Sequence, residues 1–231
     1  MSRRSDRTPP AQPGAPARAA QAVARSAPQE VRLIGGRLKR TPLSVPTWPG
    51  LRPTPARVRE TLFNWLGQDL TGWRVLDAFA GSGALGLEAA SRGAQEVVLI
   101  EREGPLAQHL RATVSRLKLT EARVLQDDAL SWMQRCAREQ ATGRFDLILL
   151  DPPFDDDLFD LALTRAAACV PVGGWIYLEA SHAYGDAGSE GVATRPLPPD
   201  LRLHRQGRAG AVHYHLIQRM GAQATAPATP A

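Results

Sequence analysis

The segment Val75-Leu-Asp-Ala-Phe-Ala-Gly-Ser-Gly-Ala-Leu-Gly, residues 75–86, decides the fold of this chain. Its apolar start predicts a buried strand, which runs into a glycine loop and then into a helix. Glycines allow the backbone of such a loop to approach a ligand closely, and a helix start presents unpaired N–H groups. The segment therefore predicts a nucleotide-binding loop at the carboxyl end of a strand.

The residues after this segment continue the alternation of strand and helix. Strand-like stretches at 74–79, 96–101, 122–126, 145–150 and 174–179 alternate with helix-like stretches at 84–92, 105–117, 130–139 and 158–168. Strict alternation predicts an α/β fold with a doubly wound, mostly parallel sheet, whose ligands bind beyond the carboxyl ends of the strands. Residues 201–206 and 211–218 flank Gly207 to Gly210 and predict a final antiparallel hairpin.

The residues before the segment predict an appendage. Residues 31–40 alternate apolar and basic side chains around Gly35-Gly36, a pair that suits a tight hairpin turn. Thr54-Pro55 reads as the N-cap and first residue of an amphipathic helix that ends near Leu66. We expect an extension over residues 31–70, a main α/β domain over 71–220, and disordered tails at 1–30 and 221–231.

Positive charge is concentrated in the first quarter of the chain. The net charge is +5, yet residues 31–59 contain seven Lys or Arg and no acid, whereas residues from 60 onward contain sixteen basic and twenty-one acidic side chains. Such asymmetry suits a polyanionic partner, because neutralised phosphates release counterions. The predicted contacts to the phosphates of such a partner are Arg37, Lys39, Arg40, Arg52, Arg57 and Arg59.

The remaining composition excludes other classes of protein. No apolar stretch approaches the roughly 20 residues that cross a bilayer, and Arg3-Arg4 is not followed by the apolar region of a secretory signal. The two cysteines, Cys136 and Cys169, lie far apart in apolar segments, which favours buried thiols over a disulfide or a metal site. We expect a cytoplasmic protein.

The glycine loop alone leaves two cofactors open. Gly81, Gly83 and Gly86 match G-x-G-x-x-G, and Glu101 ends the next strand, where an acid that binds ribose is expected in dinucleotide dehydrogenases as well. Asp77 favours S-adenosylmethionine, because a carboxylate suits its cationic amino-acid end and would repel a pyrophosphate. The alternative role of Asp77 is to cap the loop.

The third strand ends in Asp127-Asp128. We favour Asp128 as the acceptor for the adenine amine, with Asp127 as its rival and an N-cap of the following helix as the alternative role. The predicted cofactor-binding residues are Asp77, Phe79, Gly81, Ser82, Gly83, Glu101 and Asp128.

The fourth strand ends in Asp151-Pro152-Pro153-Phe154. The two prolines donate no N–H groups, so the Asp151 carboxylate and the backbone carbonyls form a cluster of acceptors. Such a cluster fits an exocyclic amine of guanine or adenine, and Phe154 offers an apolar face to a base swung out of its stack. These four residues are the predicted catalytic residues, and no metal is needed.

With these motifs the chain resembles the bacterial methyltransferases that modify the N2 amine of guanine 966 in 16S ribosomal RNA. The resemblance spans about Val31 to Arg219, and its most specific part runs from Arg52 to Trp65, within Leu51-Arg-Pro-Thr-Pro-Ala-Arg-Val-Arg-Glu-Thr-Leu-Phe-Asn-Trp-Leu. It implies the class I methyltransferase fold, S-adenosylmethionine as cofactor and an N-terminal extension that helps to hold RNA. The chain departs from the family pattern at Thr113 and at Arg205-Gln-Gly-Arg208.

Three other functions compete with this one. A DNA-adenine or protein-glutamine methyltransferase would share the loop and the Pro-Pro tip, and only the basic extension argues against it. A nicotinamide dehydrogenase would need a second substrate domain, for which the chain has little room. A binding factor without activity would tolerate a broken Asp151-Pro-Pro-Phe tip, which here is intact. We therefore expect a monomeric enzyme that acts on 16S ribosomal RNA, free or in a partly assembled small subunit.

Overall fold

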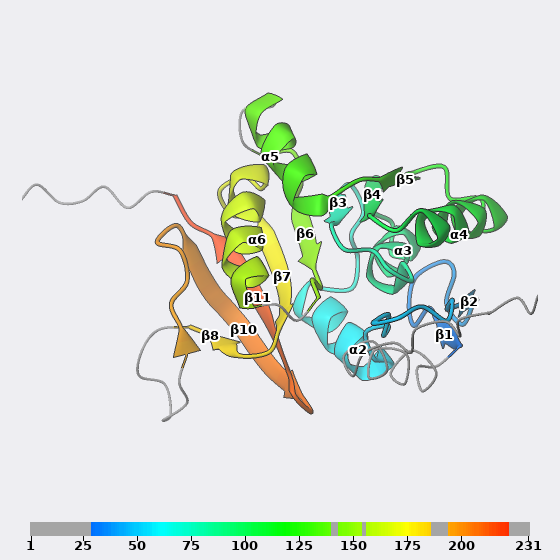
Figure 1. Ribbon diagram of the computed structural model, residues 1–231, viewed down its shortest axis with the longest axis horizontal. Helices are drawn as coiled ribbons and strands as arrows, with labels where there is room; N and C mark the ends of the chain where they lie inside the picture. The colour runs from blue at the N-terminus through cyan, green and yellow to red at the C-terminus, as the bar shows by residue number, and fades with distance from the viewer. Residues whose placement is uncertain (1–28, 140–142, 154–155, 186–193, 222–231) are drawn as a thin grey trace, which may run out of the picture.

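The computed structural model describes residues 29–139, 143–153, 156–185 and 194–221. Its centre is a seven-stranded sheet in the order β10-β11-β7-β6-β3-β4-β5 (Figure 1). The strands span Arg74–Asp77 (β3), Glu96–Glu101 (β4), Ala122–Gln126 (β5), Leu147–Leu150 (β6), Trp175–Ala180 (β7), Leu201–Ala209 (β10) and Val212–Arg219 (β11). The helices span Ala56–Trp65 (α2), Ala84–Ser91 (α3), Gly104–Arg116 (α4), Ala129–Glu139 (α5) and Asp156–Cys169 (α6).

The strand order places a crevice at the centre of the sheet. The chain runs outward from β3 through β4 to β5 and then returns to β6 on the other side of β3, all in parallel pairs. Ligands of such sheets bind where the order reverses, beyond the carboxyl ends of the strands. The predicted parallel sheet is confirmed, and so is the final hairpin, since β11 pairs antiparallel with both β7 and β10.

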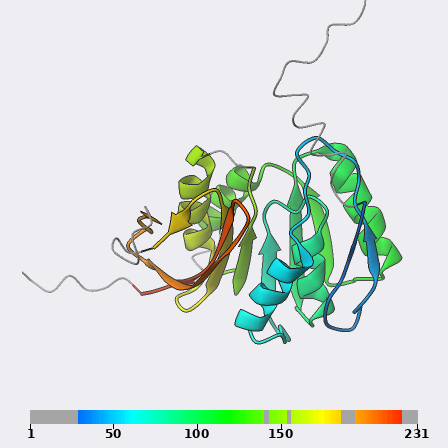
Figure 2. The same ribbon diagram turned by 90° about the horizontal axis from the view of Figure 1, so that it is seen from below.

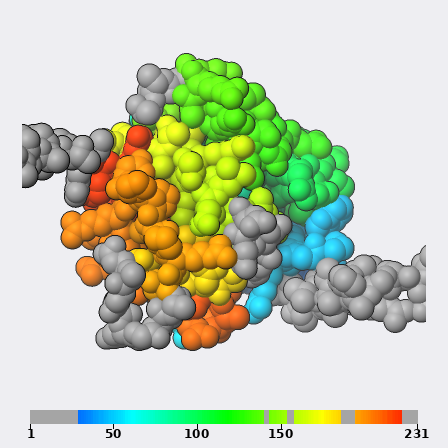
Figure 3. Space-filling model, turned by 60° about the vertical axis from the view of Figure 1, so that its left-hand side comes forward, coloured from blue at the N-terminus to red at the C-terminus, as the bar shows by residue number. Residues whose placement is uncertain are grey.

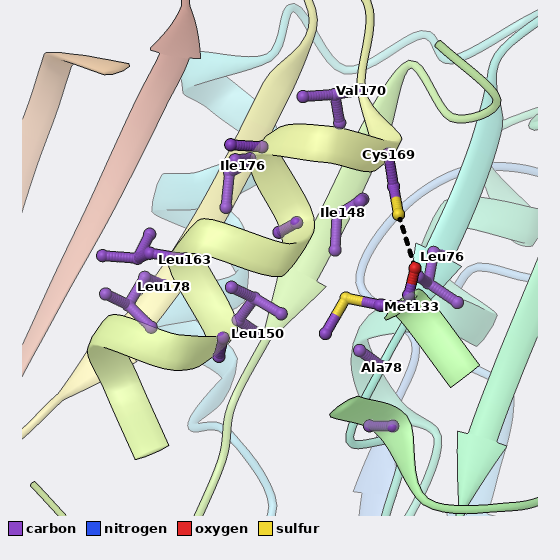
Figure 4. Close-up of a cluster of buried hydrophobic side chains, with 14 of the residues drawn as sticks. Leu76, Ala78, Met133, Ile148, Leu150, Leu163, Cys169, Val170, Ile176 and Leu178 are labelled. Carbon is purple, nitrogen blue, oxygen red and sulfur yellow. Dashed lines mark hydrogen bonds between the residues drawn. The ribbon is translucent and has the colours of Figure 1, made fainter. Parts of the chain in front are cut away.

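Alternate residues of each strand enter two separate cores. Leu76, Ile148 and Leu178 face α5 and α6, where the Cys169 thiol donates a hydrogen bond to the Met133 carbonyl at 3.4 Å (Figure 4). The opposite core packs against α2, α3 and α4. Both cysteines are buried free thiols, as expected. No helix among the described residues has both the length and the apolarity of a membrane span.

Helix α2 and the final hairpin are packed together. Phe63 is completely buried, and Trp65 stacks on Tyr214 of β11 with ring centroids 5.5 Å apart. These contacts confirm that the helical pattern of residues 55–66 marks a core-facing helix. The helix begins one residue later than predicted, because Pro55 is its N-cap and makes no side-chain capping bond.

The tight turn predicted at Gly35-Gly36 is wrong. Strands β1 (Glu30–Arg32) and β2 (Pro42–Ser44) pair antiparallel, but the intervening residues form a longer connection. A Cβ at Gly36, which has φ +70°, would lie 1.9 Å from the Ser91 carbonyl oxygen. The glycines are therefore required by close packing on α3. In Figure 2 β1, β2 and the residues between them lie at the opposite end of the molecule from β10 and β11.

A buried ion cluster fixes the extension to α3. Glu88 of α3 is fully buried. It accepts hydrogen bonds from the backbone N–H groups of Ile34 and Gly35 at 2.9 and 2.8 Å, and it forms ion pairs with Arg59 at 3.3 Å and Arg92 at 2.9 Å.

Two more short strands, β8 (Ala183–Tyr184) and β9 (Thr194–Arg195), pair in parallel beside the main sheet.

Candidate active site

Four carboxylates lie at the carboxyl ends of four adjacent strands. Glu101 ends β4, Asp77 ends β3, Asp151 follows β6, and Glu179 is the penultimate residue of β7. Parallel pairing places Leu150 beside Leu178, so Asp151 and Glu179 follow at matching levels. Side chains alternate along a strand, and each of these acids is two residues from a member of the core packed against α2 and α3. All four therefore point to one face of the sheet, in the crevice beside the glycine loop.

Asp77 is the most buried of these acids. It is 1% exposed, and its Oδ2 accepts the N–H of Gly86 in α3 at 2.8 Å. Burial raises the pKa of Asp77 to about 7, with hydrogen bonds from the Gly86 and Phe79 backbone opposing the shift and Glu101 adding to it. The loop-capping alternative is thus confirmed as one role of Asp77, and its carboxylate also contributes negative charge to the crevice.

The glycine loop is held by Glu101. The N–H of Gly81 donates to Glu101 Oε2 at 2.9 Å, and the N–H of Glu103 donates to Oε1 at 2.8 Å. Gly81 and Gly83 have φ angles of +50° and +77°, and a Cβ on Gly83 would lie 2.6 Å from Leu110 Cδ2. The loop thus requires glycine for both conformation and space, and Ser82 between these two is buried.

The two acids at the end of β5, Asp127 and Asp128, each bind a residue of α5. Asp128 Oδ1 accepts the N–H of Ser131 at 2.8 Å at the start of α5, so the N-cap alternative is confirmed for this residue. These bonds lower the pKa of Asp128. Asp127 forms an ion pair with Arg135. Phe79 is partly buried against the core on the α5 and α6 face.

Asp151 is partly exposed in the crevice and surrounded by acids. Burial and the nearby carboxylates of Glu179 and Asp77 raise the pKa of Asp151 well above its usual range. Pro152 is buried and Pro153 is exposed, whereas the predicted apolar platform, Phe154, lies outside the described residues.

Three residues of this site were missed by the sequence analysis. Thr54 donates its hydroxyl to Asp151 Oδ2 at 3.4 Å, although the Thr-Pro pair had predicted an N-cap. Glu179, which is 4% exposed, accepts the Tyr177 hydroxyl at 2.9 Å. An acid at the end of an apolar strand was the available signal for Glu179, and the same signal had identified Asp77.

The residues predicted to contact RNA differ in their exposure to solvent. Lys39, Arg40, Arg52 and Arg57 are exposed, and Arg37 is exposed and paired with Glu121. The prediction is wrong for Arg59, which is 1% exposed and paired with Glu88. An arginine that closes a buried ion cluster cannot reach a phosphate. Figure 3 shows α6 between the extension, on one side, and the final hairpin, on the other.

Comparison with known proteins identifies the family. Residues 31–218 match the family described as Conserved hypothetical protein 95. The ribosomal RNA small subunit methyltransferase D of Escherichia coli is 39% identical over 190 residues, which cover 82% of this chain and 90% of that protein. The chain belongs to the methyltransferase D family. The family member from Haemophilus influenzae is also 39% identical, over 82% of this chain and 94% of its own length.

Solved structures agree with the methyltransferase D assignment. An Escherichia coli protein of known structure is 35% identical, covers 83% of this chain with 98% of its own length, and superposes with a TM-score of 0.67. A structure from Haemophilus influenzae gives 30% identity and a TM-score of 0.65, over 83% of this chain and 99% of its own. The fold is therefore the class I methyltransferase sandwich, which confirms the predicted fold class.

Proposed function

We propose that this chain transfers a methyl group from S-adenosylmethionine to the N2 amine of a guanine in 16S ribosomal RNA, and that this guanine is nucleotide 966. Its family relatives are named as small-subunit ribosomal RNA methyltransferases, and the chain shares that enzyme class and cofactor. The observation that carries the proposal is the alignment of acids at the crevice, with Asp151 and its two prolines at the end of β6.

The crevice fits the proposed cofactor by charge. Asp77 and Glu101 lie beside a glycine loop that starts a helix, and a pKa raised by burial means that Asp77 would gain from a cationic ligand. S-adenosylmethionine supplies a methyl group on a positively charged sulfonium, and its amino-acid end is also cationic. A pyrophosphate in the same crevice would meet these carboxylates at high electrostatic cost, so the dehydrogenase alternative is disfavoured.

The chain's own residues supply orientation and a proton acceptor. Asp151 and the Pro152 carbonyl accept hydrogen bonds from the two amine hydrogens, which directs the nitrogen lone pair towards the methyl group. Asp151 would take the proton that the amine nitrogen loses on gaining the methyl group, while bound S-adenosylmethionine would supply that methyl group and keep the electron pair of the broken carbon–sulfur bond. The positive charge lost by the sulfonium would then be carried by the proton that Asp151 gains.

The exposed basic residues of the extension are proposed to hold the RNA. Lys39, Arg40, Arg52 and Arg57 are exposed on the extension, and Thr54 of the same segment contacts Asp151. RNA held by the extension would therefore be delivered to the catalytic tip. We further propose that the enzyme is a cytoplasmic monomer, and that its substrate is 16S ribosomal RNA, free or within a partly assembled small subunit.

The test is the mapping of methylated nucleotides by mass spectrometry in 16S ribosomal RNA from cells with and without this gene. We expect one N2-methylguanine to disappear and to return with wild-type protein, but not with Asp151→Ala. Calorimetry should show that this variant binds S-adenosylhomocysteine almost as wild type does, because the glycine loop is intact. An unchanged methylation map, or the loss of a methylated adenine instead, would overturn the proposal.

A further inference from the structure

A continuous chain of contacts joins the extension to the catalytic carboxylate. Arg59 of α2, held by Glu88, donates from Nε to the Thr54 carbonyl at 3.2 Å, and Thr54 in turn donates from Oγ1 to Asp151 Oδ2 at 3.4 Å. Thr54 is 4% exposed and lies between Pro53 and Pro55, whose rings fix their backbone φ angles. The position of this hydroxyl is thus set by buried contacts on both sides.

Glu179 faces the same carboxylate from the neighbouring strand. It follows β7 residue Leu178, the partner of Leu150, and it is held by the Tyr177 hydroxyl at 2.9 Å. Its pKa is raised by burial and partly lowered again by hydrogen bonds from Tyr177 and Thr54. The Thr54 hydroxyl donates to Asp151, and Glu179 lies on the neighbouring strand beside this pair.

We propose that Thr54 and Glu179 are positioning residues for Asp151, with Thr54 orienting the carboxylate that receives the amine and Glu179 opposing its ionisation. The inference rests on the proposed function, in which Asp151 must be ionised to accept the amine hydrogens. Neither residue touches the substrate in this proposal. Each acts through Asp151.

The two residues have opposite electrostatic signs. A hydrogen bond from Thr54 stabilises the ionised form of Asp151 and lowers its pKa, whereas the charge of Glu179 raises it. The other titratable groups that face Asp151 are Asp77 from β3, whose charge also raises this pKa, and Tyr177 from β7. Transfer should therefore rise with pH as Asp151 loses its proton, and the midpoint should respond to both neighbours.

The experiment compares single-turnover methyl transfer to 16S ribosomal RNA across pH in the full-length chain. We expect Thr54→Val to move the midpoint to higher pH and to lower the plateau, and Glu179→Gln to move the midpoint to lower pH. Thr54→Ser should restore the wild-type profile, because it restores the hydroxyl. Thr61→Val is the matched control, since Thr61 lies in α2, the helix that follows Thr54, and its hydroxyl donates to the Arg57 carbonyl at 2.9 Å.

The outcomes separate this inference from the proposed function. Wild-type protein that methylates no guanine would refute the function itself. If the wild-type protein is active but the midpoints of Thr54→Val and Glu179→Gln shift in the same direction, or neither shifts, the positioning roles are refuted. S-adenosylhomocysteine titration of each variant identifies a loss of folding, and in that case Thr54→Ala and Tyr177→Phe repeat the test. Tyr177→Phe removes a bond that favours ionised Glu179, so it should shift the midpoint as Glu179→Gln does.

Discussion

Asp77→Asn should make the protein more stable at neutral pH while weakening its cofactor binding. The wild-type carboxylate is 1% exposed, and burial raises its pKa from 3.8 to about 7. Asparagine keeps a carbonyl oxygen for the Gly86 N–H, at 2.8 Å in the wild type, but carries no charge. The substitution therefore removes the cost of a buried ionised group and preserves its principal hydrogen bond.

The magnitude follows from proton linkage. The folded state holds its proton more tightly than the unfolded state, so wild-type stability falls as pH rises from about 4 to about 7. At about 1.4 kcal/mol per pKa unit, a shift of roughly three units costs at most about 4 kcal/mol at pH 8 and about 2 kcal/mol at pH 5. Asparagine does not ionise and avoids this cost. The stability of the Asp77→Asn variant relative to wild type should therefore increase by about 2 kcal/mol from pH 5 to pH 8.

Urea unfolding of both proteins at several pH values, without cofactor, measures this difference. Asp69→Asn is the control of opposite sign, because Asp69 is exposed and hydrogen bonds from Thr71 lower its pKa. That variant should lose stability at neutral pH and match wild type in acid. An Asp77→Asn variant that is less stable than wild type at pH 8, or equally favoured at pH 5 and pH 8, would refute the reasoning.

Three further predictions concern the loop, the extension and the buried ion cluster. Glu101→Ala should weaken S-adenosylhomocysteine binding by about 1.5–3 kcal/mol in calorimetry, because the charge-assisted hydrogen bonds from the ribose of the ligand to the Glu101 carboxylate are lost. Lys39→Ala with Arg40→Ala should flatten the log-log salt dependence of RNA affinity by about 1.4 units if each side chain meets one phosphate. Arg59→Met should lower the free energy of unfolding by about 3 kcal/mol, since Glu88 loses one of its two buried partners.

A different experimental result would contradict each of these three predictions. Unchanged cofactor affinity would remove Glu101 from the site, and an unchanged salt slope would show that the charge of the extension serves only solubility. Arg57→Ala is the control for the ion cluster, because Arg57 is exposed on the same helix and its loss should change stability by less than about 0.5 kcal/mol. Equal stability losses at positions 57 and 59 would contradict the structural role of Arg59.

The sheet could be predicted because its signals are local. Each strand and helix of the alternation is a short run with its own periodicity, and the glycine loop carries its conformational requirement in its own residues. An acidic residue at the end of an apolar strand is also a local signal. Asp77 was found in this way, and Glu179 was open to the same reasoning.

The errors arose where a side chain's role depends on a partner distant in sequence. Arg59 has the spacing of an exposed residue on an amphipathic helix, and only Glu88, on α3, makes its burial possible. The available clue was Glu88 itself, an acid in a helix otherwise composed of apolar and small residues, which requires a buried cation. Thr54 is similar, because Thr-Pro before a helix predicts an N-cap, and only the return of the chain at β6 brings Asp151 to its hydroxyl. The extension therefore contributes to the candidate site: the helix that was predicted to present Arg59 to RNA instead uses this side chain to hold Thr54 against the carboxylate of Asp151.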